Sequence, residues 1–153
     1  MSDYSKSVFK NPFFLRQKLN LYLQTPEKTE LYARACEKFT KNGLLEWRFS
    51  WSWWAFFFPV FFFAFRKHYF TAFFALLMTN LCPVLSNIFY AMFAKYFIIG
   101  RFCEYLNYKD DDILIKNGGK PNIIVAILFF SILMFLIANF LGNYILKSFK
   151  FLI

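Results

Sequence analysis

The feature that most constrains the fold is an uncharged run of sixteen residues, 50–65, inside the aromatic block 49–69 (FSWSWWAFFFPVFFFAFRKHY). A helix of that length measures roughly 24 Å, which is less than the ~30 Å hydrocarbon core of a bilayer. Pro59 lies near its middle, where proline removes a backbone hydrogen bond and favours a kink. The block therefore predicts a short or re-entrant membrane helix that bends at Pro59.

Residue types that favour the membrane interface lie at both ends of this block. They are three tryptophans near its start and a basic triplet at its end: Trp51, Trp53, Trp54, Arg66, Lys67 and His68. Tryptophan concentrates at the level of lipid headgroups, and basic side chains at a helix end extend toward water. We expect all six at the membrane interface, where the basic triplet either reaches water or binds a headgroup phosphate.

Three further apolar helices are expected after the block. Their predicted bounds are 69–81, 83–100 and 123–146. Pro83 separates the first two, because the combined apolar run is too long for one helix across a bilayer. In the last helix Ala138 and Gly142 lie one turn apart, a spacing typical of helix-packing faces in membranes.

The chain before the aromatic block is polar or amphipathic. Residues 1–10 are polar and are expected to be mobile. Two amphipathic helices begin at Pro12 and Pro26, because in both places a capping residue precedes a proline. The second is expected to run to Asn42 and to stop at Gly43.

Composition and charge agree with this division of the chain. Of the 153 residues, 59% are hydrophobic, above the 45–50% typical of soluble proteins. The net charge of +9 comes from Lys and Arg beside apolar segments, which favours anionic lipid headgroups over nucleic acid as the partner. We therefore predict an all-α membrane protein, with an amphipathic cytoplasmic region at 1–48 and a membrane domain at 49–153.

The distribution of Lys and Arg predicts the topology. If the aromatic block spans the bilayer and three crossings follow, eleven Lys and Arg lie inside and seven lie outside. If the block instead dips in and returns to the same side, sixteen lie inside and two outside. The positive-inside rule favours the second arrangement, with a cytoplasmic N-terminus and three crossings by the later apolar helices.

The sequence contains no catalytic or metal-binding pattern. Cys36, Cys82 and Cys103 form no C-x-x-C motif, and His68 is the single histidine. The adjacent acids Asp110–Asp112 point in different directions and lack the alternating ligands of a calcium loop. We expect no enzymatic activity, no cofactor and no metal.

The segment from Tyr32 to Tyr69 resembles a family of small bacterial inner-membrane proteins that is known only as a domain of unknown function. The matching residues are Tyr32, Lys38-Phe39, Gly43, the core 52–58 (SWWAFFF) and the closing motif 65–69 (FRKHY). The chain lacks the glycine that precedes the proline of the family motif. The resemblance implies a multi-pass protein of the bacterial inner membrane and implies no activity.

Two functional hypotheses follow. The first is a non-catalytic protein that packs against a membrane complex or assembles with itself. The second is a small transporter or channel component in which amides such as Asn87 and Asn139 line a polar path. A headgroup-processing enzyme would need an acid–base pair that the sequence does not contain.

Overall fold

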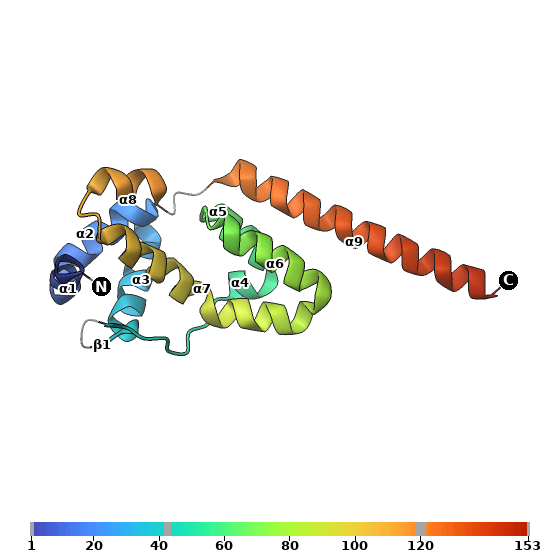
Figure 1. Ribbon diagram of the computed structural model, residues 1–153, viewed down its shortest axis with the longest axis horizontal. Helices are drawn as coiled ribbons and strands as arrows, with labels where there is room; N and C mark the ends of the chain where they lie inside the picture. The colour runs from blue at the N-terminus through green and yellow to red at the C-terminus, as the bar shows by residue number, and fades with distance from the viewer. Residues whose placement is uncertain (1, 42–43, 119–121, 153) are drawn as a thin grey trace.

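The computed structural model describes residues 2–41, 44–118 and 122–152. The protein is 81% helical and all-α, with one pair of two-residue strands among the described residues. Figure 1 shows the N-terminal helices gathered at one end, while the last helix projects away from the other. In chain order the elements are α1 (Asp3–Lys10), α2 (Pro12–Leu23), α3 (Pro26–Phe39), β1 (Thr40–Lys41), β2 (Leu44–Leu45), α4 (Trp53–Phe57), α5 (Pro59–Phe65), α6 (Tyr69–Leu81), α7 (Pro83–Leu106), α8 (Asp111–Asn117) and α9 (Ile123–Leu152).

The N-terminal residues form helix α1, so the expectation of a mobile segment at 1–10 is wrong. Ser2 caps the helix, because its Oγ accepts the amide N–H of Ser5 at 3.2 Å. The amide of Ser2 and the hydroxyl of Ser5 also donate to Oδ1 of Asn107, at 3.1 and 2.8 Å. Val8 is fully buried beneath the helix. Contacts with a residue distant in sequence thus order this polar segment.

Both expected proline-marked helix starts are confirmed. Pro12 and Pro26 are the first residues of α2 and α3. The side chain of Asn11 caps α2 by accepting two amide N–H groups of the first turn, at 3.1 and 3.3 Å. Proline fits this position because its missing N–H is one that the first turn leaves unpaired anyway.

Helix α3 ends at Phe39, whereas the sequence predicts that it continues to Asn42. Thr40 has extended backbone angles and begins β1, which pairs with β2 in antiparallel fashion. The amide of Glu46 donates to the carbonyl oxygen of Phe39 at 2.8 Å and closes this hairpin. The predicted stop at Gly43 lies outside the described residues.

The aromatic block breaks at its proline, as predicted. α4 ends at Phe57, and α5 begins with Pro59 as its first residue. After α5, Lys67 adopts a left-handed backbone with φ 59°, and the chain reverses into α6. α5 and α6 consequently pack side by side as a hairpin.

The later apolar helices match the prediction at their starts and extend beyond it at two of their ends. α6 has the expected bounds, whereas α7 continues to Leu106 instead of residue 100, and α9 to Leu152 instead of 146. The added turns of α7 bury Phe102, Cys103 and Leu106 against the N-terminal helices. The sequence pattern ends α7 too early because that burial depends on distant partners.

Buried side chains form two cores, and α7 contributes to both. The polar lobe comprises α1–α3, α8 and the second half of α7, and its core includes Leu15, Leu19, Tyr22, Phe39, Ile99 and Phe102. The apolar lobe comprises α4–α6, the first half of α7 and the start of α9, and its core includes Val60, Phe63, Ala64, Ala72, Tyr90 and Ala94. The polar lobe therefore unites the N-terminal region with later parts of the chain.

Large apolar side chains are exposed over much of the apolar lobe. The turn between α6 and α7 presents Leu81 and Leu85, which are 74% and 71% exposed. By length and composition α7 is the one helix among the described residues that is suited to cross a membrane. The apolar helix α6 and the apolar stretch Ile123–Asn139 of α9 are shorter.

Gly118, directly after α8, approaches two backbone carbonyls too closely to accept a side chain. A Cβ there would collide with the carbonyl oxygens of Leu114 and Tyr22. We predict that Gly118→Ala lowers the free energy of unfolding by about 1–3 kcal/mol, since overpacking must shift α8 from α2. Denaturant unfolding in mild detergent measures the change.

The matched control is Gly100→Ala in α7. A Cβ at this glycine makes only an ordinary contact with the side chain of Leu45, at 3.8 Å, and alanine favours a helix over glycine by about 1 kcal/mol. The control should therefore keep or slightly raise stability. Equal destabilisation by both substitutions would contradict the close approach of α8 to α2.

Candidate functional site

The turn between α5 and α6 carries the basic triplet, and its three side chains contact three different neighbours. Nη1 of Arg66 donates to Oγ1 of Thr25 at 3.1 Å. The guanidinium carbon lies 5.8 Å from the ring centre of Tyr32, a cation–π geometry. Arg66 is only 6% exposed, so its charge is held against α3 inside the protein.

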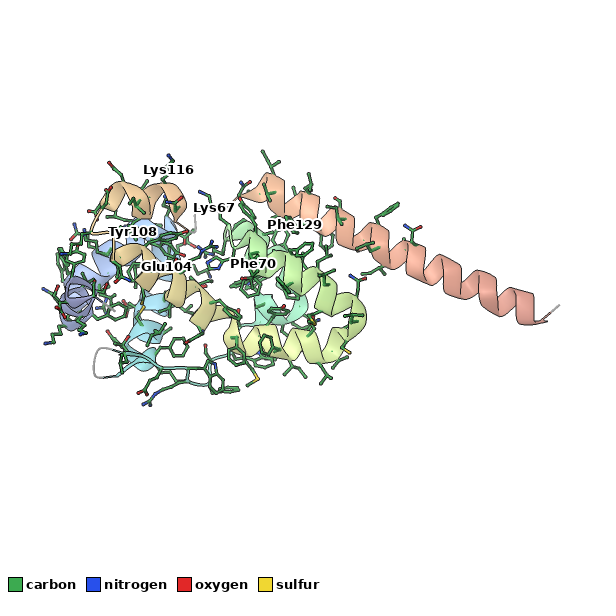
Figure 2. All side chains as sticks on the ribbon, viewed as in Figure 1. Lys67, Phe70, Glu104, Tyr108, Lys116 and Phe129 are labelled. Carbon is green, nitrogen blue, oxygen red and sulfur yellow. The ribbon has the colours of Figure 1, made fainter. Side chains whose placement is uncertain are left out.

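Lys67 reaches in another direction, toward α8. Its Nζ donates to the carbonyl oxygen of Lys116 at 3.4 Å, and Figure 2 shows these two residues near each other between α5 and α8. A cation near the last turn of a helix is favourable, because carbonyl groups there lack partners within the helix. This contact links the turn to the polar lobe.

His68 is buried at the contact between the lobes, with 3% of its surface exposed. Its Nε2 lies 3.5 Å from the hydroxyl of Tyr22, and its ring lies 6.3 Å from that of Phe63. Burial, together with the charges of Arg101 and Arg66, lowers the pKa of His68 to about 3. The imidazole is therefore neutral at physiological pH and serves as a packing group between the cores.

The three tryptophans differ in exposure. Trp53 and Trp54 project from α4 and are 64% and 67% exposed. Trp51 is half-buried and meets the ring of Trp53 edge-on at 5.5 Å. Its indole N–H is buried and has no hydrogen-bond acceptor among the described residues.

These elements enclose a cavity of about 480 Å³ between the two lobes. Its polar-lobe wall comes from α3, with Lys28, Leu31 and Tyr32, while α7 contributes Lys95. The opposite walls are aromatic and come from the segment before α4, from α4 and from α5: Trp51, Trp53, Trp54, Phe61, Phe62 and Phe65. Arg66 completes a set of three cations, and no acidic side chain lines the cavity.

Two acids at the start of α8 have structural partners. The side chain of Asp110 accepts the amide N–H of Asp112 at 2.9 Å and so caps α8. Asp111 forms an ion pair with Lys18 of α2 at 2.5 Å. Among the residues that the structure describes, no three His, Cys, Asp or Glu side chains gather in a way that suits a metal ion.

The predicted packing face of α9 lies far from this cavity. Phe129, near the start of the helix, packs against the apolar core (Figure 2). Further along, Ala138 is exposed, and Gly142 has open space beside it. Asn139 donates to the carbonyl oxygen of Phe135 in its own helix at 2.9 Å. The role of Ala138 and Gly142 in helix packing stays a prediction.

Sequence reasoning named four of the cavity's residues, Trp51, Trp53, Trp54 and Arg66, but placed them at a membrane surface. Lys28 and Lys95 were not among the predicted interface residues. Lys95 is the single charged residue of the apolar run 83–100 and was the available signal, because ionisable residues in apolar helices face protein or a cavity. No local pattern indicated that α3 forms the opposite wall.

No protein-family model, curated protein or solved structure matches this chain. The resemblance of residues 32–69 to a bacterial membrane-protein family therefore stays a prediction.

Because His68 is buried and neutral, we predict that the protein loses stability as the pH is lowered. The folded-state pKa is about 3, while the ordinary value of 6.5 applies after unfolding, so protonation favours the unfolded chain. This contribution is complete above pH 6.5 and declines by up to ~1.4 kcal/mol per pH unit below it. We expect the free energy of unfolding to drop by about 2 kcal/mol between pH 7.5 and 5.

His68→Gln provides the control, because it removes the only histidine and keeps a neutral polar side chain. Hydrogen bonds from Arg16 and Arg34 lower the pKa of Glu30, so this carboxylate does not contribute to a change in this range. The variant should have nearly constant stability between pH 7.5 and 5. A decline as steep as that of the parent protein would assign the effect to another group.

Proposed function

We propose that this chain is a small bacterial inner-membrane protein without catalytic activity, which assembles with a membrane-protein partner or with a second copy of itself. Its polar lobe, including the N-terminus, lies on the cytoplasmic side. Its apolar lobe lies in a bilayer with anionic headgroups. The positive-inside distribution of Lys and Arg supports this orientation.

The observation that carries the proposal is the concentration of exposed large apolar side chains on the apolar lobe, whereas the polar lobe exposes only scattered ones such as Phe13. Phe70, Val84 and Trp54 are between 67% and 73% exposed, and similar side chains continue along α6, α7 and α9. A soluble monomer rarely exposes apolar patches larger than a few hundred Å². The polar lobe instead presents ion pairs such as Arg16 with Glu30, at 2.8 Å.

Helix lengths suggest how deeply each element enters the bilayer. α6 has 13 residues and spans roughly 20 Å, less than the ~30 Å hydrocarbon core. The second half of α7 is buried in the polar lobe and is not available to lipid. We therefore propose that the α6–α7 hairpin ends inside the bilayer, whereas the apolar run 123–146 of α9, with 24 residues and roughly 36 Å, crosses it.

Cys82 reports this depth, because it lies at the tip of the hairpin and is exposed on the protein surface. A charged reagent is excluded from hydrocarbon, whereas a neutral, lipid-soluble reagent enters it. In native membranes we expect Cys82 to react about tenfold or more slowly with a charged, membrane-impermeant maleimide than with a lipid-soluble one, from either side.

The other two cysteines should not react with either maleimide, because Cys36 and Cys103 are buried. Burial also raises the pKa of the Cys36 thiol. Tyr108→Cys, at a polar-lobe position that is 62% exposed, should react rapidly with the charged reagent from the cytoplasmic side. Labelling of Cys82 from outside intact cells would show instead that residues 69–81 and 83–100 cross and recross the bilayer.

The projection of α9 supports assembly. Its start packs against α5 and α6, but Figure 1 shows most of its length extending beyond the other helices. Apolar side chains on that extension, among them Phe135, are exposed. A helix that contacts its own chain along only one part is suited to pack against another transmembrane helix.

Assembly predicts a particle larger than the monomer. After extraction with a gentle detergent, the protein mass, corrected for bound detergent, should be at least twice the chain mass of 18.4 kDa, or should include a second protein. Ala138→Leu should shift this distribution toward the monomer, while Leu136→Phe, which adds bulk on the opposite face of the same helix, serves as a control. A parent protein that is purely monomeric and brings no partner would contradict the proposal.

One observation supports the transporter hypothesis as a second candidate. Oδ1 of Asn87, in the apolar lobe, is buried and accepts no hydrogen bond within the described chain. Buried polar groups without partners are uncommon, and in membrane helices they often mark a path for a polar solute. Solute flux through proteoliposomes that Asn87→Leu abolishes would favour this function over simple assembly.

A further inference from the structure

We propose that the cavity between the lobes binds one anionic phospholipid from the surrounding bilayer. Its phosphate meets the cationic side of the cavity, and an acyl chain follows the aromatic walls. This inference rests on the proposed membrane placement, because a bilayer lipid reaches the cavity only when the apolar lobe is embedded.

The charges that line the cavity favour an anionic ligand. Lys28, Arg66 and Lys95 approach the cavity from three different elements, and no acidic side chain lines it. Arg66 is held in place by Thr25 and by the ring of Tyr32, so its position is fixed before any ligand arrives. A phosphate that enters the cavity meets only cations and can accept charge-assisted hydrogen bonds from them.

The aromatic walls of the cavity favour a ligand that also has apolar groups over a small soluble anion. Six aromatic side chains from the segment before α4, from α4 and from α5 line the cavity. The indole N–H of Trp51 adds a buried donor that lacks an acceptor among the described residues. The volume of about 480 Å³ lies within the ~300–1,000 Å³ range of small-molecule sites, which leaves room for apolar groups beside a phosphate.

The location of the cavity favours a lipid as the source of the anion. α3 of the polar lobe forms one wall, and α4 and α5 of the apolar lobe form the others, so the cavity lies where headgroups meet hydrocarbon if the apolar lobe is embedded. Trp53 and Trp54 belong both to the wall and to the exposed apolar surface. An acyl chain can thus pass from the bilayer along these rings without entering water.

Intrinsic fluorescence tests this directly, because three of the four tryptophans line the cavity. The full chain is placed in phosphatidylcholine nanodiscs that contain increasing fractions of lipid with brominated chains, which quench tryptophan on contact. We expect brominated phosphatidylglycerol to reach half-maximal quenching at about one twenty-fifth of the mole fraction of brominated phosphatidylcholine, since each of the two lysines favours an anionic lipid by about fivefold. Equal quenching by both lipids overturns the proposal.

Two double variants test whether the preference for phosphatidylglycerol comes from the lysines of the cavity. Lys28→Gln with Lys95→Gln should remove most of the preference for phosphatidylglycerol. Lys10→Gln with Lys116→Gln lowers the net charge equally, at exposed positions in the polar lobe, and should retain the preference. If the two pairs behave alike, the preference comes from net charge and the cavity site is wrong.

Two further measurements separate the remaining explanations. With Trp51, Trp53 and Trp54 changed to Phe, only Trp47 reports, and charge-selective quenching should disappear; its persistence would place the lipid elsewhere. Millimolar inorganic phosphate should not relieve the quenching, and relief would identify a soluble-anion site instead.

The same nanodiscs distinguish failure of this proposal from failure of the membrane placement. If Cys82 is shielded from the charged maleimide and no lipid preference exists, the cavity proposal alone fails. If Cys82 reacts freely, the embedded placement fails and the lipid site fails with it.

Discussion

Helix α7 supplies buried side chains to two hydrophobic cores at once, and the rest of the structure depends on this sharing. Its first half packs Tyr90 and Ala94 into the apolar lobe, and its second half packs Ile99 and Phe102 into the polar lobe. A continuous helix of 24 residues, roughly 36 Å long, is stiff enough to fix the distance between the two cores. The cavity exists because this distance is set by α7 while the facing walls come from other helices. A change in the packing of either lobe therefore alters the cavity as well.

Most helix boundaries could be predicted from the sequence, because the residues that start these helices act locally. Proline begins α2, α3, α5 and α7, and it can do so because the first turn of a helix leaves its N–H groups unpaired. The parts that sequence reasoning missed depend on distant contacts. Helix α1 forms where polar composition predicted mobility, since Ser2 and Ser5 bond to Asn107. The last turns of α7 were missed for the same reason, because the N-terminal helices that bury them are distant in sequence.

The candidate site was only partly predictable, for a similar reason. An aromatic block with a basic end is typical of a membrane interface, and Trp53 and Trp54 are indeed exposed. The directions of Arg66 and His68, however, depend on the left-handed backbone of Lys67, a conformation that a non-glycine residue rarely adopts and that no pattern here indicates. That reversal turns Arg66 toward Tyr32 and buries His68 against Tyr22. Whether a basic residue meets solvent or protein is thus decided by chain direction, which composition does not encode.

The bonds that close the polar lobe join the two ends of a long stretch of chain, and this has a consequence for biosynthesis. Lys18 pairs with Asp111, and the side-chain amide of Gln24 donates to the carbonyl of Ile115; these partners are 93 and 91 residues apart. The aromatic block and the α6–α7 hairpin therefore leave the ribosome before the lobe that precedes them can close. During that interval the face of α2 that packs on α8 and the face of α3 that packs on α7 have no partner. Until the polar lobe closes, these faces can aggregate unless a chaperone or another apolar surface shields them.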